Sequence, residues 1–100
     1  MLRLVGHELE HLPPKLGMTC NNLISLSLTS NRLVEVDCAQ QLTRLTSLVL
    51  LRNKIAKLPS GIGNLVGLKV LELASNRLES LPATFGNLTN LKKLNLECNR

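Results

Sequence analysis

A chain of 100 residues holds one domain with a modest core, which must be built from leucine, isoleucine and valine because Phe85 is the only aromatic residue. The net charge of +5 is spread along the chain rather than gathered in a basic run. With no second aromatic residue on which bases could stack, nucleic acid is not expected as a partner. Apolar residues alternate with polar ones throughout, so we expect no membrane insertion.

The first residues and the cysteines bear on the cellular compartment. Residues 1–8 lack the apolar stretch of a secretory signal. Cys20, Cys38 and Cys98 are odd in number and far apart, which fits reduced thiols better than a disulfide framework. We therefore expect a cytoplasmic protein.

One frame of leucines recurs along the chain. In its clearest copy, Leu68, Leu71 and Leu73 are followed by Asn76 and Leu78. The asparagine position recurs at steps of 22 to 24 residues, with a histidine in the first unit, and marks five units: His7, Asn31, Asn53, Asn76 and Asn99. A period in the low twenties with this leucine spacing is the signature of leucine-rich repeats among repeat architectures.

Each unit is predicted to begin with a short strand. Leu71 and Leu73 point to one side because side chains alternate along a strand, so Val70 and Glu72 point to the other. One strand cannot bury its apolar side alone, whereas strands of successive units can pair at about 4.8 Å. All strands would run in the same direction. The frame therefore predicts a parallel sheet, with the return segments on its opposite face.

The asparagine of each unit stands where the chain turns away from the sheet. A side-chain amide carries both a donor and an acceptor, so it can satisfy buried backbone groups that have no ladder partner. We expect His7 to do part of this job in the first unit.

The return segments vary along the chain. The first contains Pro13 and is followed by a stretch one residue longer than the standard, and the second has Asp37 where the others have proline. The third and fourth both begin with Leu-Pro, and proline ends strand-like structure and fixes the direction of the turn. For these two we predict one turn of helix or 3₁₀-helix, over residues 62–65 and 85–88.

These units resemble the leucine-rich repeats of intracellular proteins, written L-P-x-x-I-x-x-L-x-x-L-x-x-L-x-L-x-x-N-x-L. They are similar to the repeats of Scribble- and Erbin-type scaffolds and of plant intracellular Ras-group-related repeat proteins. The resemblance covers the whole chain, 1–100, which we interpret as a single domain and as part of a longer array. It implies an α/β solenoid of about five repeats, with a curved parallel sheet on the concave face and short helical, 3₁₀ or irregular returns on the convex face. It also implies protein–protein recognition.

The outward positions of the strands are the candidate binding residues. Val49, Leu51 and Val70 are apolar where contact with solvent is expected, and Arg52 and Glu72 lie beside them. An exposed apolar group with a charged rim resembles the centre of a protein-binding patch. The plainer alternative is that a few exposed aliphatic residues are normal on any surface.

A column of cations follows the asparagines, and its members are Arg32, Lys54, Arg77 and Arg100, with Glu8 in the first unit. In a stacked sheet they would form a row along one edge and could attract an acidic partner. The alternative is that they are solvated residues of the repeat consensus.

Other chemistry finds little support. His7 and His11 are not expected to share a helix face, and no third ligand accompanies them, so we predict no metal site. Gly61 and Gly63 lack the third glycine of a dinucleotide loop, and no cofactor is expected. Cys98 has no histidine in a neighbouring unit that would activate it. We therefore expect no enzymatic activity in this chain.

The sequence thus predicts a non-catalytic scaffold that binds a protein partner on the concave sheet face in a signalling context. The alternative is a repeat arm of a larger signalling enzyme, such as a kinase, a ubiquitin ligase or a GTPase, whose catalytic domain lies outside the segment. A third interpretation is end-to-end self-association, because the termini show no cap over the apolar core.

Overall fold

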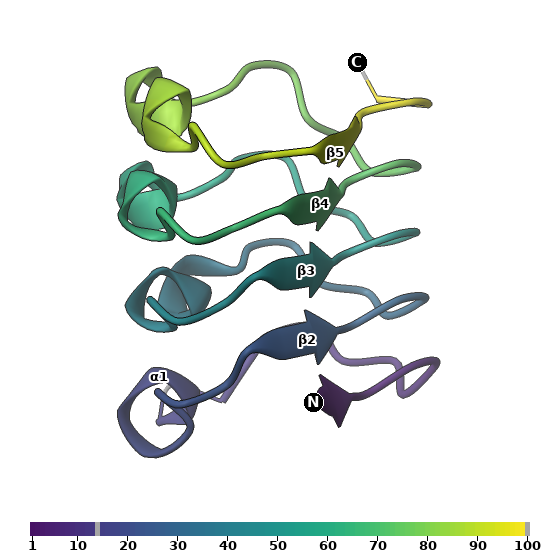
Figure 1. Cartoon of the computed structure of the whole chain (residues 1–100). Coiled ribbons are helices and arrows are strands. Elements are labelled where there is room, and N and C mark those ends of the chain that lie inside the picture. The colour runs from purple at the N-terminus through teal and green to yellow at the C-terminus, as the bar shows by residue number, and fades with distance from the viewer. Residues whose placement is uncertain (14, 100) are drawn as a thin grey trace.

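The computed structural model describes residues 1–13 and 15–99. Its five short strands form one parallel sheet in the order β1-β2-β3-β4-β5. The strands are β1 (Leu2–Arg3), β2 (Ser25–Ser27), β3 (Ser47–Val49), β4 (Val70–Glu72) and β5 (Lys93–Asn95). Figure 1 shows the successive strands stacked in one column, with the coiled returns stacked in a second column beside them. The predicted leucine-rich-repeat solenoid with a parallel sheet is confirmed.

The register of the sheet stacks equivalent leucines of successive repeats. Leu26 pairs with Leu48, Leu48 with Leu71, and Leu71 with Leu94. The first three of these side chains have no exposed surface, and full burial of a leucine contributes about 1.5 to 3 kcal/mol. Leu94 in β5 is 41% exposed. The core is therefore a column of repeated leucine layers whose last described layer is open to solvent.

From the second repeat onward, the asparagine satisfies the backbone of two neighbouring layers, as predicted. Asn53 Oδ1 accepts a hydrogen bond from the Leu33 N–H at 3.1 Å, and its Nδ2 donates to the carbonyl oxygens of Leu28 and Leu50 at 3.0 and 3.1 Å. Asn76 repeats this pattern one layer further along. Each such amide links the turn of one repeat to the strand of the next, which explains a buried polar residue without invoking catalysis.

His7 does not take over the role of asparagine in the first repeat. Its side chain is exposed, and its backbone N–H instead donates to Asn31 Oδ1 at 3.0 Å. Asn31 also accepts from the Leu9 N–H and donates to the Leu4 carbonyl. The first repeat is thus held by the amide of the second, and the expectation for His7 is wrong because its ring points into solvent.

The returns are short helices: α1 (Leu16–Thr19), and the 3₁₀-helices η1 (Asp37–Gln41), η2 (Ser60–Asn64) and η3 (Ala83–Asn87). The prediction of one turn at 62–65 and 85–88 is confirmed in kind, but η2 and η3 begin two residues earlier. Pro59 and Pro82 are the N-caps of these helices, and their carbonyls accept the first helical hydrogen bonds. In η1, where proline is missing, Glu35 Oε2 accepts from the Asp37 N–H at 2.9 Å. Within the described residues, no helix is long and apolar enough to cross a membrane.

Candidate functional site

Two neighbouring layers of the sheet carry the predicted apolar patch. Val49 in β3 pairs with Glu72 in β4, and Val70 pairs with Ser47. Leu51 follows β3, where the ladder of backbone hydrogen bonds continues on both sides. The Ser30 N–H of the preceding repeat donates to the Leu51 carbonyl at 2.9 Å. The Arg52 N–H donates to the Ala74 carbonyl of the following repeat at 3.0 Å. The register therefore places Val49 in β3 beside β4, which carries Val70, with Leu51 two residues beyond Val49 on the same face. We call these three residues the apolar cluster.

The apolar cluster is half-buried rather than fully exposed. Each of its side chains retains surface in contact with solvent, whereas the leucines between them on the same strands, Leu48, Leu50 and Leu71, have none. This contrast follows from side-chain alternation, which sends every second residue of a strand to the other face. The cluster is a small apolar area whose neighbours on the sheet face include the polar residues Ser27, Ser47 and Glu72.

Glu72 has a partner that sequence reasoning missed. Its Oε1 lies 3.2 Å from Lys93 Nζ, and the Glu72 side chain is only 14% exposed. Lys93 pairs with Val70 in the ladder, so the ion pair crosses two neighbouring strands diagonally. The repeat spacing could have predicted this ion pair. Aligning the two repeats pairs Lys93 with Val70, which places Lys93 on the strand next to Glu72.

Three predicted cations occupy the same position in successive turns. The N–H groups of Arg32, Lys54 and Arg77 donate to the carbonyls of Leu9, Leu33 and Ile55 at 2.7 to 2.9 Å. All three side chains are exposed. Arg32 Nη2 lies 3.3 Å from Glu8 Oε1, so its charge is partly balanced. Arg100, which the sequence adds to this column, lies outside the described residues.

Arg52 stands in a left-handed turn that sequence reasoning also missed. Its φ is 58°, and Ser30, Ser75 and Cys98 have φ values of 59°, 58° and 56° at the equivalent positions of other repeats. Gly6 occupies this position in the first repeat with φ 71°. Glycine is the residue that favours this conformation, so Gly6 was the available signal. The turn holds the Arg52 backbone immediately after the apolar cluster.

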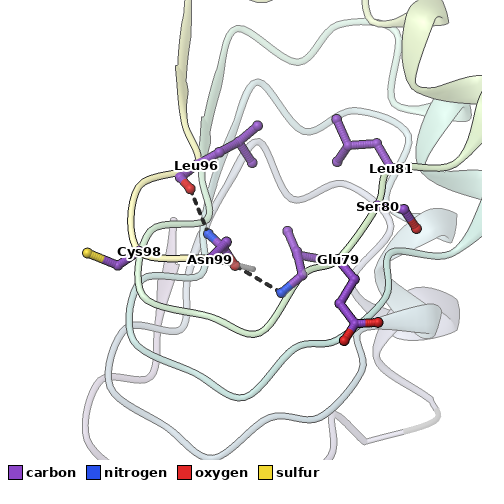
Figure 2. A pocket seen from close by; sticks show the side chains of 7 residues that line it. Glu79, Ser80, Leu81, Leu96, Cys98 and Asn99 are labelled. Atoms are coloured by element: carbon purple, nitrogen blue, oxygen red, sulfur yellow. Dashed lines mark hydrogen bonds between the residues drawn. The ribbon is translucent and has the colours of Figure 1, made fainter.

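The hollows of the surface include two that lie away from these residues. One, of about 300 Å³, is at the β5 end and is lined by Leu78, Glu79, Ser80, Leu81, Leu96, Cys98 and Asn99 (Figure 2). Within it, Asn99 hydrogen-bonds to the Leu96 carbonyl and the Leu78 N–H. Neither this hollow nor the second includes the apolar cluster, which lies on open sheet surface.

The second hollow, of about 440 Å³, lies beside the returns of the middle repeats, and its lining includes Glu35, Asp37, Lys57 and Pro59. Burial raises the pKa of the Asp37 carboxyl, and the charge of Glu35 raises it further. His11 Nδ1 lies 3.5 Å from Glu35 Oε1. Among the described residues, no group of three or more histidine, cysteine, aspartate or glutamate side chains is arranged to hold a metal ion.

The parallel strands, the 3₁₀ returns and the asparagine ladder together define a leucine-rich-repeat solenoid. The family model for the leucine rich repeat matches residues 43–100, and the chain belongs to this family. Domains of this family generally mediate protein–protein interaction and are typically non-catalytic modules.

Solved structures of similar fold come from bacteria and plants. A leucine-rich-repeat protein of Leptospira interrogans is 35% identical, with a TM-score of 0.86 over 93% of this chain and 24% of that one. The ectodomain of the receptor kinase GASSHO1/SCHENGEN3 from Arabidopsis thaliana, solved in complex with CASPARIAN STRIP INTEGRITY FACTOR 2, is 31% identical. Its TM-score is 0.79, over 97% of this chain and 12% of that one. An internalin of Listeria monocytogenes shares the fold at 24% identity, with a TM-score of 0.81 over 90% of this chain and 26% of that one.

Among curated proteins, U2 small nuclear ribonucleoprotein A' of Aspergillus fumigatus is 39% identical over 59 residues. The match covers 56% of this chain and 23% of the relative, so the chain spans about a quarter of the length of the curated protein it matches.

Proposed function

We propose that this chain is a non-catalytic interaction scaffold that binds a protein partner on the concave face of its sheet. The observation that carries the proposal is the apolar cluster, because Val49, Leu51 and Val70 lie on adjoining strands with surface open to solvent. Exposed apolar groups surrounded by polar side chains are typical of the centres of protein interfaces. Arg52 and Glu72 belong to the rim, and Arg32, Lys54 and Arg77 to the turn edge beside it.

Affinity purification with the chain as bait tests this proposal. Leu51→Glu puts a charge into the apolar cluster, whereas Arg3→Glu changes an exposed residue of β1, at the other end of the concave face. We expect Leu51→Glu to remove the captured protein and Arg3→Glu to retain it. Equal losses from both variants, or no loss from Leu51→Glu, would count against this face. Circular dichroism of each variant checks that it is folded.

A repeat arm of a larger signalling enzyme is the second candidate. One similar structure is the ectodomain of a receptor kinase, in which a repeat array accompanies a catalytic function. Leu94 is 41% exposed while its counterparts Leu48 and Leu71 are covered, so a further repeat would find an apolar layer to cover. Reading the gene on both sides of this segment tests the idea, and an immediate stop codon after Arg100 would oppose it.

The open layer also supports end-to-end self-association, which would cover Leu94 with a second copy. Light scattering over a concentration series tests this, and a constant monomer mass would oppose it.

We further propose a cytoplasmic location, as in the intracellular repeat proteins that the units resemble. Fluorescence microscopy of the tagged full-length protein tests this location.

RNA is the alternative partner to test, because a component of a ribonucleoprotein is among the similar proteins. Electrophoretic mobility shifts with RNA provide that test.

A further inference from the structure

We propose that the partner segment bound on the concave face is acidic, an extended stretch that carries carboxylates next to an aliphatic or aromatic side chain. This rests on the proposed function and specifies the chemistry of its partner. The apolar side chain would lie on the apolar cluster, and the carboxylates would face Arg52, Lys54 and Arg77, which we call the open cations.

The open cations differ from Arg32 and Lys93, two other cations near the sheet face. Within residues 1–13 and 15–99, none of them has a carboxylate oxygen within 4.0 Å. Arg32, by contrast, is paired with Glu8, and Lys93 is paired with Glu72. Three positive charges beside the apolar cluster therefore have no counter-charge in the fold, and an acidic partner would supply it.

Backbone hydrogen bonds fix the open cations in the turns that follow the two strands of the apolar cluster. Arg52 directly follows Leu51, and its N–H donates to the Ala74 carbonyl of the next layer at 3.0 Å. The N–H groups of Lys54 and Arg77 are held by the carbonyls of Leu33 and Ile55. Lys54 belongs to the repeat of β3 and Arg77 to the repeat of β4, the two strands that carry the cluster. Neighbouring strands are about 4.8 Å apart, so a short extended segment can reach both sets of residues.

The sheet face offers little negative charge that would attract a basic partner. The Glu72 carboxylate is largely covered and faces Lys93, so it offers little charge to a partner. Glu97 is exposed, but it lies beyond β5, at the far end of the sheet. Electrostatic complementarity with an acidic segment would therefore concentrate at the middle repeats, where the apolar cluster lies.

Phosphate groups of RNA could also meet the open cations, but the remaining features favour a peptide. The one aromatic side chain, Phe85, belongs to η3 in the column of returns and packs against the core, so the sheet face offers no aromatic surface for stacking bases. A row of phosphates would also leave the apolar cluster unused. A peptide with one apolar side chain among carboxylates uses both features.

Selection from a display library of random linear peptides, with the folded chain as bait, tests the inference. We expect enriched peptides to combine aspartate or glutamate with a neighbouring aliphatic or aromatic residue. One enriched peptide is then synthesised with a fluorescent label, and its dissociation constant is measured by anisotropy. The triple variant Arg52→Gln, Lys54→Gln, Arg77→Gln should weaken binding by roughly tenfold, and added salt should reduce this difference.

A charge-matched control separates the open cations from the overall charge. Lys15→Gln, Arg44→Gln, Lys57→Gln removes three exposed cations from the return segments, and should leave the dissociation constant close to that of the unmodified chain. Leu51→Gln reports on the apolar cluster without adding a charge. Thermal melts followed by circular dichroism establish that each variant is folded.

The outcomes distinguish the inference from the proposed function. Enriched peptides without carboxylates, whose binding still depends on Leu51, would overturn the acidic partner and retain the concave binding face. No enrichment, or enrichment that survives Leu51→Gln, would overturn both. Displacement of the peptide by single-stranded RNA, with RNA binding that depends on the open cations and not on Leu51, would overturn the acidic peptide in favour of nucleic acid.

Discussion

Gly63 in η2 packs directly against Thr84 in η3, one repeat further along the chain. A Cβ atom at Gly63 would lie 2.7 Å from the Thr84 carbonyl oxygen and 2.8 Å from the Thr84 Cβ, closer than such atoms approach in proteins. The helices of neighbouring repeats can therefore pack this closely only because residue 63 has no side chain. Gly86, the equivalent residue of the next repeat, has nothing within 4 Å of the same position.

The substitution Gly63→Ala is therefore predicted to destabilise the fold. The added methyl group must push η3 away from η2, and overpacking of this kind costs about 1 to 3 kcal/mol. Urea denaturation followed by circular dichroism measures the change in the free energy of unfolding. Gly86→Ala is the matched control, and it should change stability by less than about 0.5 kcal/mol or raise it slightly. Equal effects of the two substitutions would contradict the packing seen between η2 and η3.

Asn53→Ala is predicted to cost about 2 to 4 kcal/mol of unfolding free energy. The substitution leaves the buried Leu33 N–H without its acceptor, and it removes the hydrogen bonds to the carbonyls of Leu28 and Leu50. These two carbonyls retain a hydrogen bond each, from Asn31 and Asn76, so the donor dominates the loss. Thermal and urea denaturation measure the effect. Asn64→Ala, at an exposed site in η2, is the control, and a similar loss there would refute the role of the amide ladder.

The frame of leucines and asparagines was sufficient to predict the fold because each of its positions has a local physical cause. Alternation along the strand sets which leucines are buried, and the turn requires an amide that satisfies backbone groups of two layers. Leu71 and Asn76 obey these rules in the same way as Leu48 and Asn53. The four repeats from the second onward thus share the same leucine and asparagine positions, and the parallel sheet follows from their repetition.

Features that depend on the neighbouring layer could not be read from one repeat. Gly63 and Gly86 occupy equivalent positions of two repeats. Of the two, only Gly63 has a neighbouring residue that leaves no room for a larger side chain. The pairing of Glu72 with Lys93 likewise depends on which residue the next repeat presents across the sheet. The left-handed turn at Arg52 was hidden because its residue type does not favour that conformation, and only the equivalent Gly6 pointed to it.

The candidate binding face was predictable in its position but not in its charge balance. The outward direction of Val49 and Val70 follows from strand geometry, and the structure brings them onto adjoining strands. Which cations lack a counter-charge depends on side-chain approach across repeats, as in the pair of Arg32 with Glu8. Sequence spacing alone treats Arg32 and Arg77 as equivalent.

The pKa of Asp37 predicts a small pH dependence of stability. Burial raises this pKa and Glu35 raises it further, so the folded chain holds the proton more tightly than the unfolded chain. The resulting stabilisation is present below the unfolded pKa and is lost as pH rises through the folded pKa. Asp37→Asn should therefore gain stability relative to the unmodified chain as pH rises above about 3.9, the pKa of an unperturbed aspartate, by less than about 0.5 kcal/mol because the side chain is exposed.

Carbon-detected NMR titration measures the same effect directly. Glu35→Gln should lower the pKa of Asp37 only part of the way towards that of an unstructured peptide, because burial is the larger cause and remains. A pKa for Asp37 that is not raised in the unmodified chain would contradict the arrangement of these two carboxylates.

Equivalent leucines in β4 and β5 should respond differently to truncation. Leu71→Ala should cost about 2 to 5 kcal/mol, because this fully buried side chain leaves a cavity between layers. Leu94→Ala, in the same position one repeat later, should cost less than about 1 kcal/mol at low protein concentration, because the side chain is already 41% exposed.

Urea denaturation at several protein concentrations extends this comparison to self-association. If copies stack on the open layer, the unmodified chain gains stability as its concentration rises, because association stabilises the folded state by mass action. Leu94→Glu should abolish that gain by placing a charge in the contact, while Arg44→Gln, at an exposed site in a middle repeat, should retain it. Unfolding free energies that do not change with concentration, together with a small cost for Leu94→Ala throughout, would mean that Leu94 stays exposed to water and that copies of this chain do not stack through β5.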